Sequence, residues 1–139
     1  MVRSERQQEQ GAKELFRLLQ EEDPPLFKWW TETFIPSLGG FANRHMDAAP
    51  GENVKTSNWT LYSLSVHPDY QGQGISRLLV KAGEDQAKAQ NLRTIFEASE
   101  DKNVAIYKRL GYEEKGLEHV DGPPGLPGYN MHLMGKTPV

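Results

Sequence analysis

The stretch "VHPDYQGQGISRLLVKAGEDQ", residues 66–86, passes from the end of an apolar run through a glycine turn into an amphipathic segment. Gly72 and Gly74 lack a Cβ atom, so the turn can adopt unusual dihedral angles and direct several backbone N–H groups at one point. The apolar positions that follow have helical spacing: Ile75, Leu78, Leu79 and Ala82. The unpaired N–H groups and the dipole at the start of a helix attract anions. The turn therefore predicts a site for a phosphate or pyrophosphate.

The turn by itself leaves a second interpretation open, because a Gly-x-Gly turn can also join a strand to a helix without binding anything. Two common nucleotide motifs do not fit. The P-loop pattern G-x-x-x-x-G-K-[ST] is absent from the sequence, and Arg77 stands where the dinucleotide pattern G-x-G-x-x-G has its last glycine. The turn alone does not distinguish a phosphate site from a connecting turn, so the distinction rests on the elements around it and on the rest of the chain.

Hydrophobic spacing and breaker residues divide the chain into a mostly helical first half and an alternating second half. In the first half we expect a helix over 4–22, then over 26–49 one helix or two broken near Pro36 and Gly39-Gly40, and a loop over 49–58. In the second half we expect a strand over 59–66, a helix over 75–90, a strand over 92–99, a helix over 101–111, a strand over 112–120, a loop over 121–128 and a strand over 129–136. Asp101 is a candidate N-cap and Gly111 a candidate left-handed C-terminal residue. The strand–helix–strand order from Trp59 predicts a parallel pair with a right-handed crossover.

The composition is typical of a globular protein, with 139 residues, 37% hydrophobic residues, 25% charged residues and a net charge of −3. This length predicts one domain, residues 1–139. The negative net charge argues against a nucleic-acid partner. With no cysteine and no metal-ligand spacing among four histidines, we expect no metal. No apolar run of about 20 residues and no signal-peptide pattern are present, so we expect no membrane segment and a cytoplasmic location.

Two motifs in the second half resemble the GNAT superfamily of N-acetyltransferases. "SVHPDYQGQGISRLLV" is similar to the family's pyrophosphate loop, of form Gln/Arg-x-x-Gly-x-Gly/Ala, with Gln71, Gly74 and Ser76 at the marked positions. "IYKRLGY", residues 106–112, is similar to the family's "LYEKLGF" element. The resemblance covers 59–136 and, more loosely, points to small acetyltransferase-like proteins of fungi. It implies an α/β (α+β) fold: a mixed sheet with splayed central parallel strands, flanked by helices.

The resemblance also implies a binding site for acetyl-CoA, the co-substrate of this family. The backbone at Leu64 and Val66 would pair with the pantetheine arm, and an N–H group near Leu64 or Ser65 would polarise the thioester carbonyl. The loop residues Gln71, Gly72, Gln73, Gly74, Ile75 and Ser76 would hold the pyrophosphate through their backbone N–H groups. Ser76 departs from Gly/Ala at its position but is small. On this basis residues 59–136 would form the acetyl-CoA-binding core and 1–58 a mostly helical N-terminal part.

The catalytic groups are less sharply defined than the loop. Tyr107 matches the family tyrosine that protonates the departing thiolate, although its helical spacing with Val104 and Leu110 also fits simple packing. Relatives carry a general base on or near the strand before the loop, where "WTLYSLSV" has no carboxylate, so Glu97 on the next strand is the nearest candidate. Asn103 is a candidate CoA contact in place of a family asparagine whose position is taken here by Glu100.

These features predict an acyltransferase that moves an acetyl group from acetyl-CoA to the amine of a small molecule or peptide, by direct attack in a ternary complex. A non-catalytic acyl-CoA-binding module of the same fold is the alternative, and a partner-binding protein that has lost the cofactor is a third. The family normally has three strands before the pyrophosphate strand, and residues 1–58 show no clear trace of them. The aromatic residues of that part could cover an exposed sheet edge, form a homodimer interface or pack in the core: Phe27, Trp29, Trp30 and Phe34.

Overall fold

The computed structural model describes residues 5–138. It divides into two compact units, the first formed by the residues up to Phe41 with His119–Tyr129, and the second by Ala42–Glu118 with the residues from Asn130 onward. The single domain expected over residues 1–139 stays a prediction. No helix within residues 5–138 has the length and apolar character needed to cross a bilayer.

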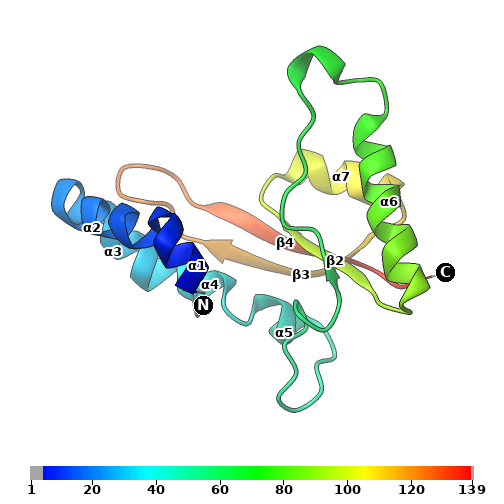
Figure 1. Cartoon of the computed structure of the whole chain (residues 1–139), viewed down its shortest axis with the longest axis horizontal. Helices are drawn as coiled ribbons and strands as arrows, with labels where there is room; N and C mark the ends of the chain where they lie inside the picture. The colour runs from blue at the N-terminus through cyan, green and yellow to red at the C-terminus, as the bar shows by residue number, and fades with distance from the viewer. Residues whose placement is uncertain (1–4, 139) are drawn as a thin grey trace. The chain divides into compact units, whose positions relative to one another are not determined.

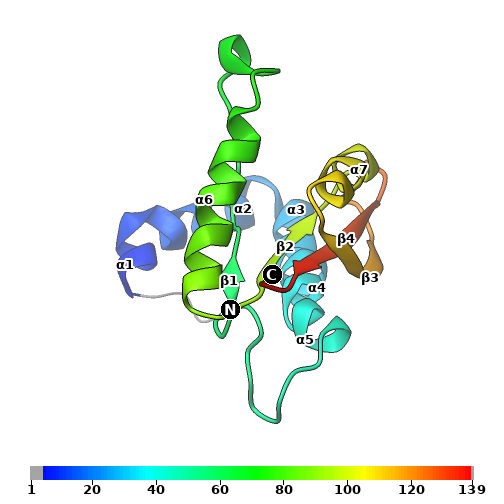
Figure 2. The ribbon, with the colours of Figure 1, turned by 90° about the vertical axis from the view of Figure 1, so that its right-hand side faces the viewer.

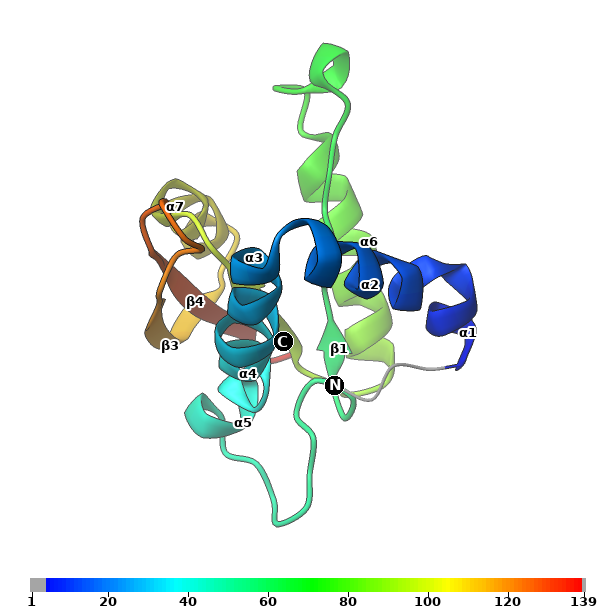
Figure 3. The same cartoon turned by 90° about the vertical axis from the view of Figure 1, so that its left-hand side faces the viewer.

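The first unit is helical, as the sequence predicts. Its elements in chain order are α1 (Glu5–Gln7), η1 (Gln8–Ala12), α2 (Lys13–Glu22), α3 (Pro24–Trp29), η2 (Trp30–Phe34) and α4 (Ile35–Leu38). Figure 3 shows α2 and α3 following one another across a turn. The turn is stable because the Asp23 carboxylate accepts a hydrogen bond from the Leu26 N–H group (3.0 Å) and Pro24 fits the first helical turn.

The predicted breaks in the first unit are partly confirmed. The helical run over the described part of 4–22 is interrupted at Gly11, where a φ of 102° lies outside the helical region. Pro36 does not break the second run, because the π-helical residues Trp30–Phe34 precede it and the hydrogen-bond register is already shifted there, with the Ile35 N–H donating to the Trp30 carbonyl. The chain turns instead at Gly39-Gly40, where Gly40 has a φ of 76°.

The second unit contains the strands and the helices that follow them (Figure 1). Its elements are α5 (Phe41–His45), β1 (Trp59–Thr60), η3 (Pro68–Tyr70), α6 (Ile75–Ala89), β2 (Thr94–Ala98), α7 (Asp101–Arg109), β3 (Glu113–Val120) and β4 (Tyr129–Lys136). Three of them begin or end in the first unit, which contains Phe41 of α5, His119 and Val120 of β3, and Tyr129 of β4. The strand order is β1-β2-β4-β3, with β1 parallel and β4 antiparallel to β2. The expected mixed sheet with a parallel pair is confirmed. Residues 5–58 contain no strand.

One face of this sheet packs under α6 and α7 (Figure 2). Phe96 and Ala98 on β2, with Met134 on β4, point to this face because side chains alternate along a strand. They form the buried cluster of the unit with Val80 of α6, Val104 of α7 and Tyr112. On the other face, His45 of α5 packs on Gly116 of β3, and Met46 lies near Gly135 of β4. The core thus fixes α6 and α7 side by side on one face.

Two local predictions are wrong. The strand expected over 59–66 is regular only at Trp59–Thr60, because β2 offers backbone partners to Trp59 and Leu61 and none to the described residues beyond. Asp101 does not cap α7, since Glu100 holds the N-cap position and makes no side-chain cap bond, and the Asp101 carboxylate faces His132 instead. Gly111 does adopt the expected left-handed conformation, with a φ of 88°.

Candidate active site

The glycine turn between η3 and α6 has the conformation that the sequence predicts. Gly72 and Gly74 have φ angles of 74° and 77°, and Gly74 is the N-cap of α6. A Cβ atom built on either glycine would meet no other atom within 4 Å, so the space in front of the turn is open. The N-terminal N–H groups of a 15-residue helix point into that space and favour an anion there.

Gln71 closes the turn through both its side chain and its backbone. Its side-chain amide donates a hydrogen bond to the Val66 carbonyl oxygen (3.0 Å), and its backbone N–H donates to the Pro68 carbonyl (3.2 Å). The Gln71 N–H group is therefore already used within the turn. The groups left for an anion are those that follow it, up to Ser76.

The chain that leads into the turn separates from β2 and opens a wedge. The Leu61 N–H group donates to the Ile95 carbonyl oxygen (3.0 Å), and no backbone hydrogen bond joins residues 62–66 to β2 within the described range. β2 continues to Ala98 on its own side of the gap and pairs there with β4. The backbone groups along 62–66, apart from the Val66 carbonyl that Gln71 occupies, can bond an elongated ligand as a strand would.

The third wall of the site is one face of α7. Asn103, Ile106, Tyr107 and Leu110 are spaced three and four residues apart, so they lie on the same side of the helix. The Tyr107 ring packs edge-on against Phe96, with 4.4 Å between ring centroids, and burial raises the pKa of its hydroxyl. Tyr107 therefore stays protonated, and able to donate a proton, throughout the neutral pH range.

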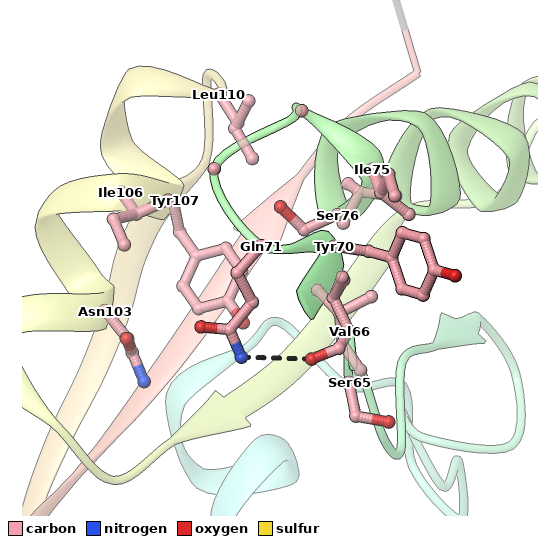
Figure 4. A pocket seen from close by; sticks show the side chains of 14 residues that line it. Ser65, Val66, Tyr70, Gln71, Ile75, Ser76, Asn103, Ile106, Tyr107 and Leu110 are labelled. Carbon is pink, nitrogen blue, oxygen red and sulfur yellow. Dashed lines mark hydrogen bonds between the residues drawn. The ribbon is translucent and has the colours of Figure 1, made fainter. Parts of the chain in front are cut away.

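These three walls enclose one cavity of about 330 Å³ (Figure 4). It is lined by the segment before the turn, the turn itself, the start of α6 and the face of α7: Leu64, Ser65, Val66, Tyr70, Gln71, Gly72, Gly74, Ile75, Ser76, Val80, Asn103, Ile106, Tyr107 and Leu110. The cavity thus combines a helix N-terminus suited to phosphate, an unpaired backbone segment and a tyrosine hydroxyl. A long anionic ligand whose reactive end reaches the tyrosine would match these walls.

The remaining sequence candidates lie elsewhere. Gln73 does not line the cavity, and its side chain reaches back to the Asp69 carbonyl oxygen (3.5 Å). Glu97 does not line it either, because its side chain points to the opposite face of β2 from Phe96. There both Glu97 oxygens accept from Lys55 Nζ, at 2.8 and 2.9 Å, and the Lys55 ammonium lies 5.4 Å from the centroid of the Tyr62 ring. No group of three or more His, Asp or Glu side chains within residues 5–138 could hold a metal ion.

Comparison with known proteins identifies the family of the chain. The model of the Acetyltransferase (GNAT) family matches residues 3–112, which is most of the sequence. The chain belongs to this family. The match includes the glycine turn and both central strands, so the resemblance carried by the two sequence motifs is confirmed.

Two curated members of the GNAT family illustrate the similarity. Mycothiol acetyltransferase of Cellulomonas flavigena is 33% identical over 96 residues, which is 66% of this chain and 26% of that protein. The ribosomal protein bS18 alanine N-acetyltransferase of Escherichia coli K12 is 29% identical over 104 residues, covering 68% of this chain and 70% of that enzyme. Both relatives are bacterial, and the looser resemblance to fungal proteins stays a prediction.

A solved structure supports the GNAT fold. The crystal structure of the ribosomal-protein-S18-alanine N-acetyltransferase from Escherichia coli superposes with a TM-score of 0.51 at 24% identity. The superposition covers 57% of this chain and 53% of that one. This likeness concerns the fold alone.

The cavity also contains residues that sequence reasoning missed: Tyr70, Val80, Ile106 and Leu110. Helical spacing could have found three of them. Val80 lies one turn after Ser76 on α6, and Ile106 and Leu110 flank Tyr107 on the same face of α7. Tyr70 carries no such signal, because its position depends on the short helix η3 that precedes the turn.

Proposed function

We propose that this protein binds acetyl-CoA in the cavity between the glycine turn and α7 and transfers the acetyl group to an amine by direct attack in a ternary complex. The observation that carries the proposal is the meeting of three features in one cavity: the N-terminus of α6, the unpaired segment 62–66 and Tyr107. The family match supports the same chemistry.

The residues of the cavity suit the pyrophosphate and the pantetheine arm of CoA. The N–H groups of Gly72 to Ser76 would hold the pyrophosphate, because φ angles near 75° turn this backbone toward the open space before α6. The backbone groups of Leu64 and the N–H group of Val66 would bind the amide groups of the pantetheine arm, while the Val66 carbonyl already accepts from Gln71. Asn103, one turn before Tyr107, would contact the ligand from α7. Gln71 would keep the loop closed rather than bind the phosphate.

Acetyl-CoA supplies the acetyl group as an activated thioester. An N–H group near Leu64 or Ser65 would donate to the carbonyl oxygen as negative charge develops on it. Tyr107 would donate its proton to the departing thiolate, a role that its raised pKa supports. The attacking amine must first lose a proton, and Glu97 is the proposed base.

The position of Glu97 also favours the second candidate, an acyl-CoA-binding module without turnover. Lys55 holds both oxygens of the carboxylate, and the pair lies outside the cavity. For Glu97 to accept a proton from an acceptor amine, that amine would have to compete with Lys55 from the other face of β2. If it cannot, the chain would bind the thioester and not consume it.

The acceptor is proposed as a small molecule or peptide amine. The bacterial relatives are named for mycothiol and for a ribosomal protein, so they span both classes. A cytoplasmic location and a homodimer are further proposals that rest on the sequence alone.

Replacement of Tyr107 by phenylalanine tests the proposed chemistry. We expect Tyr107→Phe to lower kcat by about 100-fold or more, because proton donation in a transition state is worth about 10²–10⁴-fold. The dissociation constant for acetyl-CoA should stay within about twofold, because the ring still packs on Phe96. Release of the CoA thiol measures turnover, and isothermal titration measures binding. Equal losses in both would indicate a packing role for Tyr107, and binding without thiol release across an amine panel would favour the non-catalytic module.

A further inference from the structure

His132 on β4 is a buried histidine whose two ring nitrogens both face carboxylates. Its side chain is 8% exposed. Nδ1 lies 2.6 Å from Glu114 Oε1 on β3, and Nε2 lies 2.8 Å from Asp101 Oδ1 on α7. The second oxygen of Glu114 accepts a hydrogen bond from Lys108 Nζ (2.7 Å). These four residues form a continuous polar chain, here called the α7 clamp.

The α7 clamp ties both ends of α7 to the sheet. Asp101 is the first residue of the helix and Lys108 lies in its last turn. His132 stands opposite Ala98 in the β2–β4 register, where β2 ends and the chain turns into α7. Between the two tie points lie Asn103 and Tyr107, which line the cavity. These contacts act on α7 beside the packing of Val104 and Tyr107 against Phe96.

The protonation state of the His132 imidazole decides whether it can make both of its hydrogen bonds in the clamp. Ionised carboxylates only accept hydrogen bonds, so both His132 nitrogens must carry a proton to satisfy Asp101 and Glu114 together. Lys108 and then His132 lower the pKa of Glu114, which keeps that carboxylate ionised. The neighbouring strand β2 brings only Ala98 opposite His132, and near Asp101 the charges of Glu100 and Lys102 pair with each other (2.6 Å). In a neutral imidazole one ring nitrogen has a lone pair in place of its proton. That nitrogen cannot donate to the carboxylate it faces, so one of the two hydrogen bonds is lost.

We infer that His132 is a positioning residue for the acetyl-transfer reaction, which holds α7 and Tyr107 in place when its imidazole is doubly protonated and loosens them when it is not. The inference rests on the proposed function for its catalytic consequence. The clamp itself is a statement about α7 and can be measured without turnover.

The variant Asp101→Asn gives a matched test. The Asp101 side chain is 79% exposed, so its replacement by an isosteric amide should leave the fold intact. The amide can accept from a protonated Nε2 through its oxygen and donate to an unprotonated Nε2 through its nitrogen. The clamp in Asp101→Asn should therefore hold at any charge of the imidazole. Asp101→Ala removes the contact between residue 101 and His132 at every pH, and it serves as the control without this hydrogen bond.

The experiment compares kcat of each variant with that of the wild type from about pH 5 to about pH 8. The ratio cancels the protonation of the acceptor amine. We expect the Asp101→Asn to wild-type ratio to rise about three- to tenfold across this range, since small displacements of a catalytic group cost this much or more. Asp101→Ala should be slow at low pH and match the wild type at high pH, with little change in the KM for acetyl-CoA. A flat Asp101→Asn ratio in an active enzyme would overturn the inference and leave the proposed function standing.

Two readouts keep the inference testable if the wild type releases no thiol. The first is the ring ¹⁵N shifts of His132, which should show a change from double to single protonation as pH rises. The second is hydrogen exchange of the α7 amides, corrected for intrinsic exchange rates. It should become faster with that change in the wild type and should not in Asp101→Asn. Such a result would support the clamp while the proposed catalysis fails. Identical corrected exchange in the two proteins would refute the clamp directly.

Discussion

Gly74 sets the geometry of the proposed phosphate site at the level of a single residue. Its φ of 77° is costly for any residue with a Cβ atom. We expect Gly74→Ala to lower the free energy of unfolding by about 1–2 kcal/mol. The affinity for acetyl-CoA should fall by at least about tenfold, because the added methyl group takes up space before the helix N-terminus. Denaturant titration and isothermal titration calorimetry measure the two effects.

Gly51 provides the matched control for Gly74→Ala. It has a φ of 79°, an added Cβ atom would meet nothing within 4 Å, and it lies outside the cavity. Gly51→Ala should therefore carry the same backbone strain without loss of acetyl-CoA affinity. Equal affinity losses in both variants would mean that Gly74 acts through stability alone.

At the same scale, the sequence predicted residues whose role depends on local pattern and missed those that depend on distant partners. Gly74, Ser76 and Tyr107 were found because motif spacing fixes them on a turn and on a helix face. The engagement of Glu97 by Lys55 joins residues 42 positions apart, and no local pattern signals it. The same holds for Asp101, whose cap chemistry is overridden by a contact with His132 on a later strand.

Among the elements, β3 is held against α5 by a close approach at Gly116. A Cβ atom on this glycine would overlap the Cγ and Cβ atoms of His45. We expect Gly116→Ala to lower the free energy of unfolding by about 1–3 kcal/mol, the usual cost of overpacking. The measurement is a double-mutant cycle by denaturant titration: in the His45→Gly background, which removes both overlapping atoms, the same change should cost much less, and additive costs would contradict the proposed contact.

The α5–β3 contact should also depend on pH through Glu118. The Arg44 guanidinium, with hydrogen bonds of 2.7 and 2.9 Å, lowers the pKa of the Glu118 carboxyl from 4.5 to about 2. A lowered folded-state pKa adds stability above pH 4.5, which is lost as pH falls toward 2. Denaturant titration should show the stability difference between wild type and Glu118→Gln shrinking over this range. The difference should be small, because solvent screens the exposed Arg44; one that grows toward low pH would contradict the assignment.

Periodicity predicted the long elements well and the short first strand poorly. α6, α7, β3 and β4 agree with expectation because each is long enough to show a regular spacing of its less exposed residues. β1 is shorter than "WTLYSLSV" predicts, because the segment diverges from β2 after Leu61. This divergence is also what opens the cavity, so local strand propensity gave way where the proposed site is formed.

For the molecule as a whole, the mixed sheet and its parallel pair followed from the order of elements in the second half. The division into two units did not follow from the sequence. Composition and spacing describe residues 5–41 as amphipathic helices, but they do not tell which surface those helices cover.

The central claim is that acetyl-CoA binds along the wedge between residues 64–66, the turn at 71–76 and α7. Amide chemical-shift mapping on the full chain during titration with CoA tests it most directly. We predict saturable shifts at Leu64–Val66, at Gly72–Ser76 and on α7 around Asn103 and Tyr107, and none of comparable size elsewhere. The account would be contradicted by a spectrum that does not change at high micromolar CoA, or by shifts confined to residues outside this cavity.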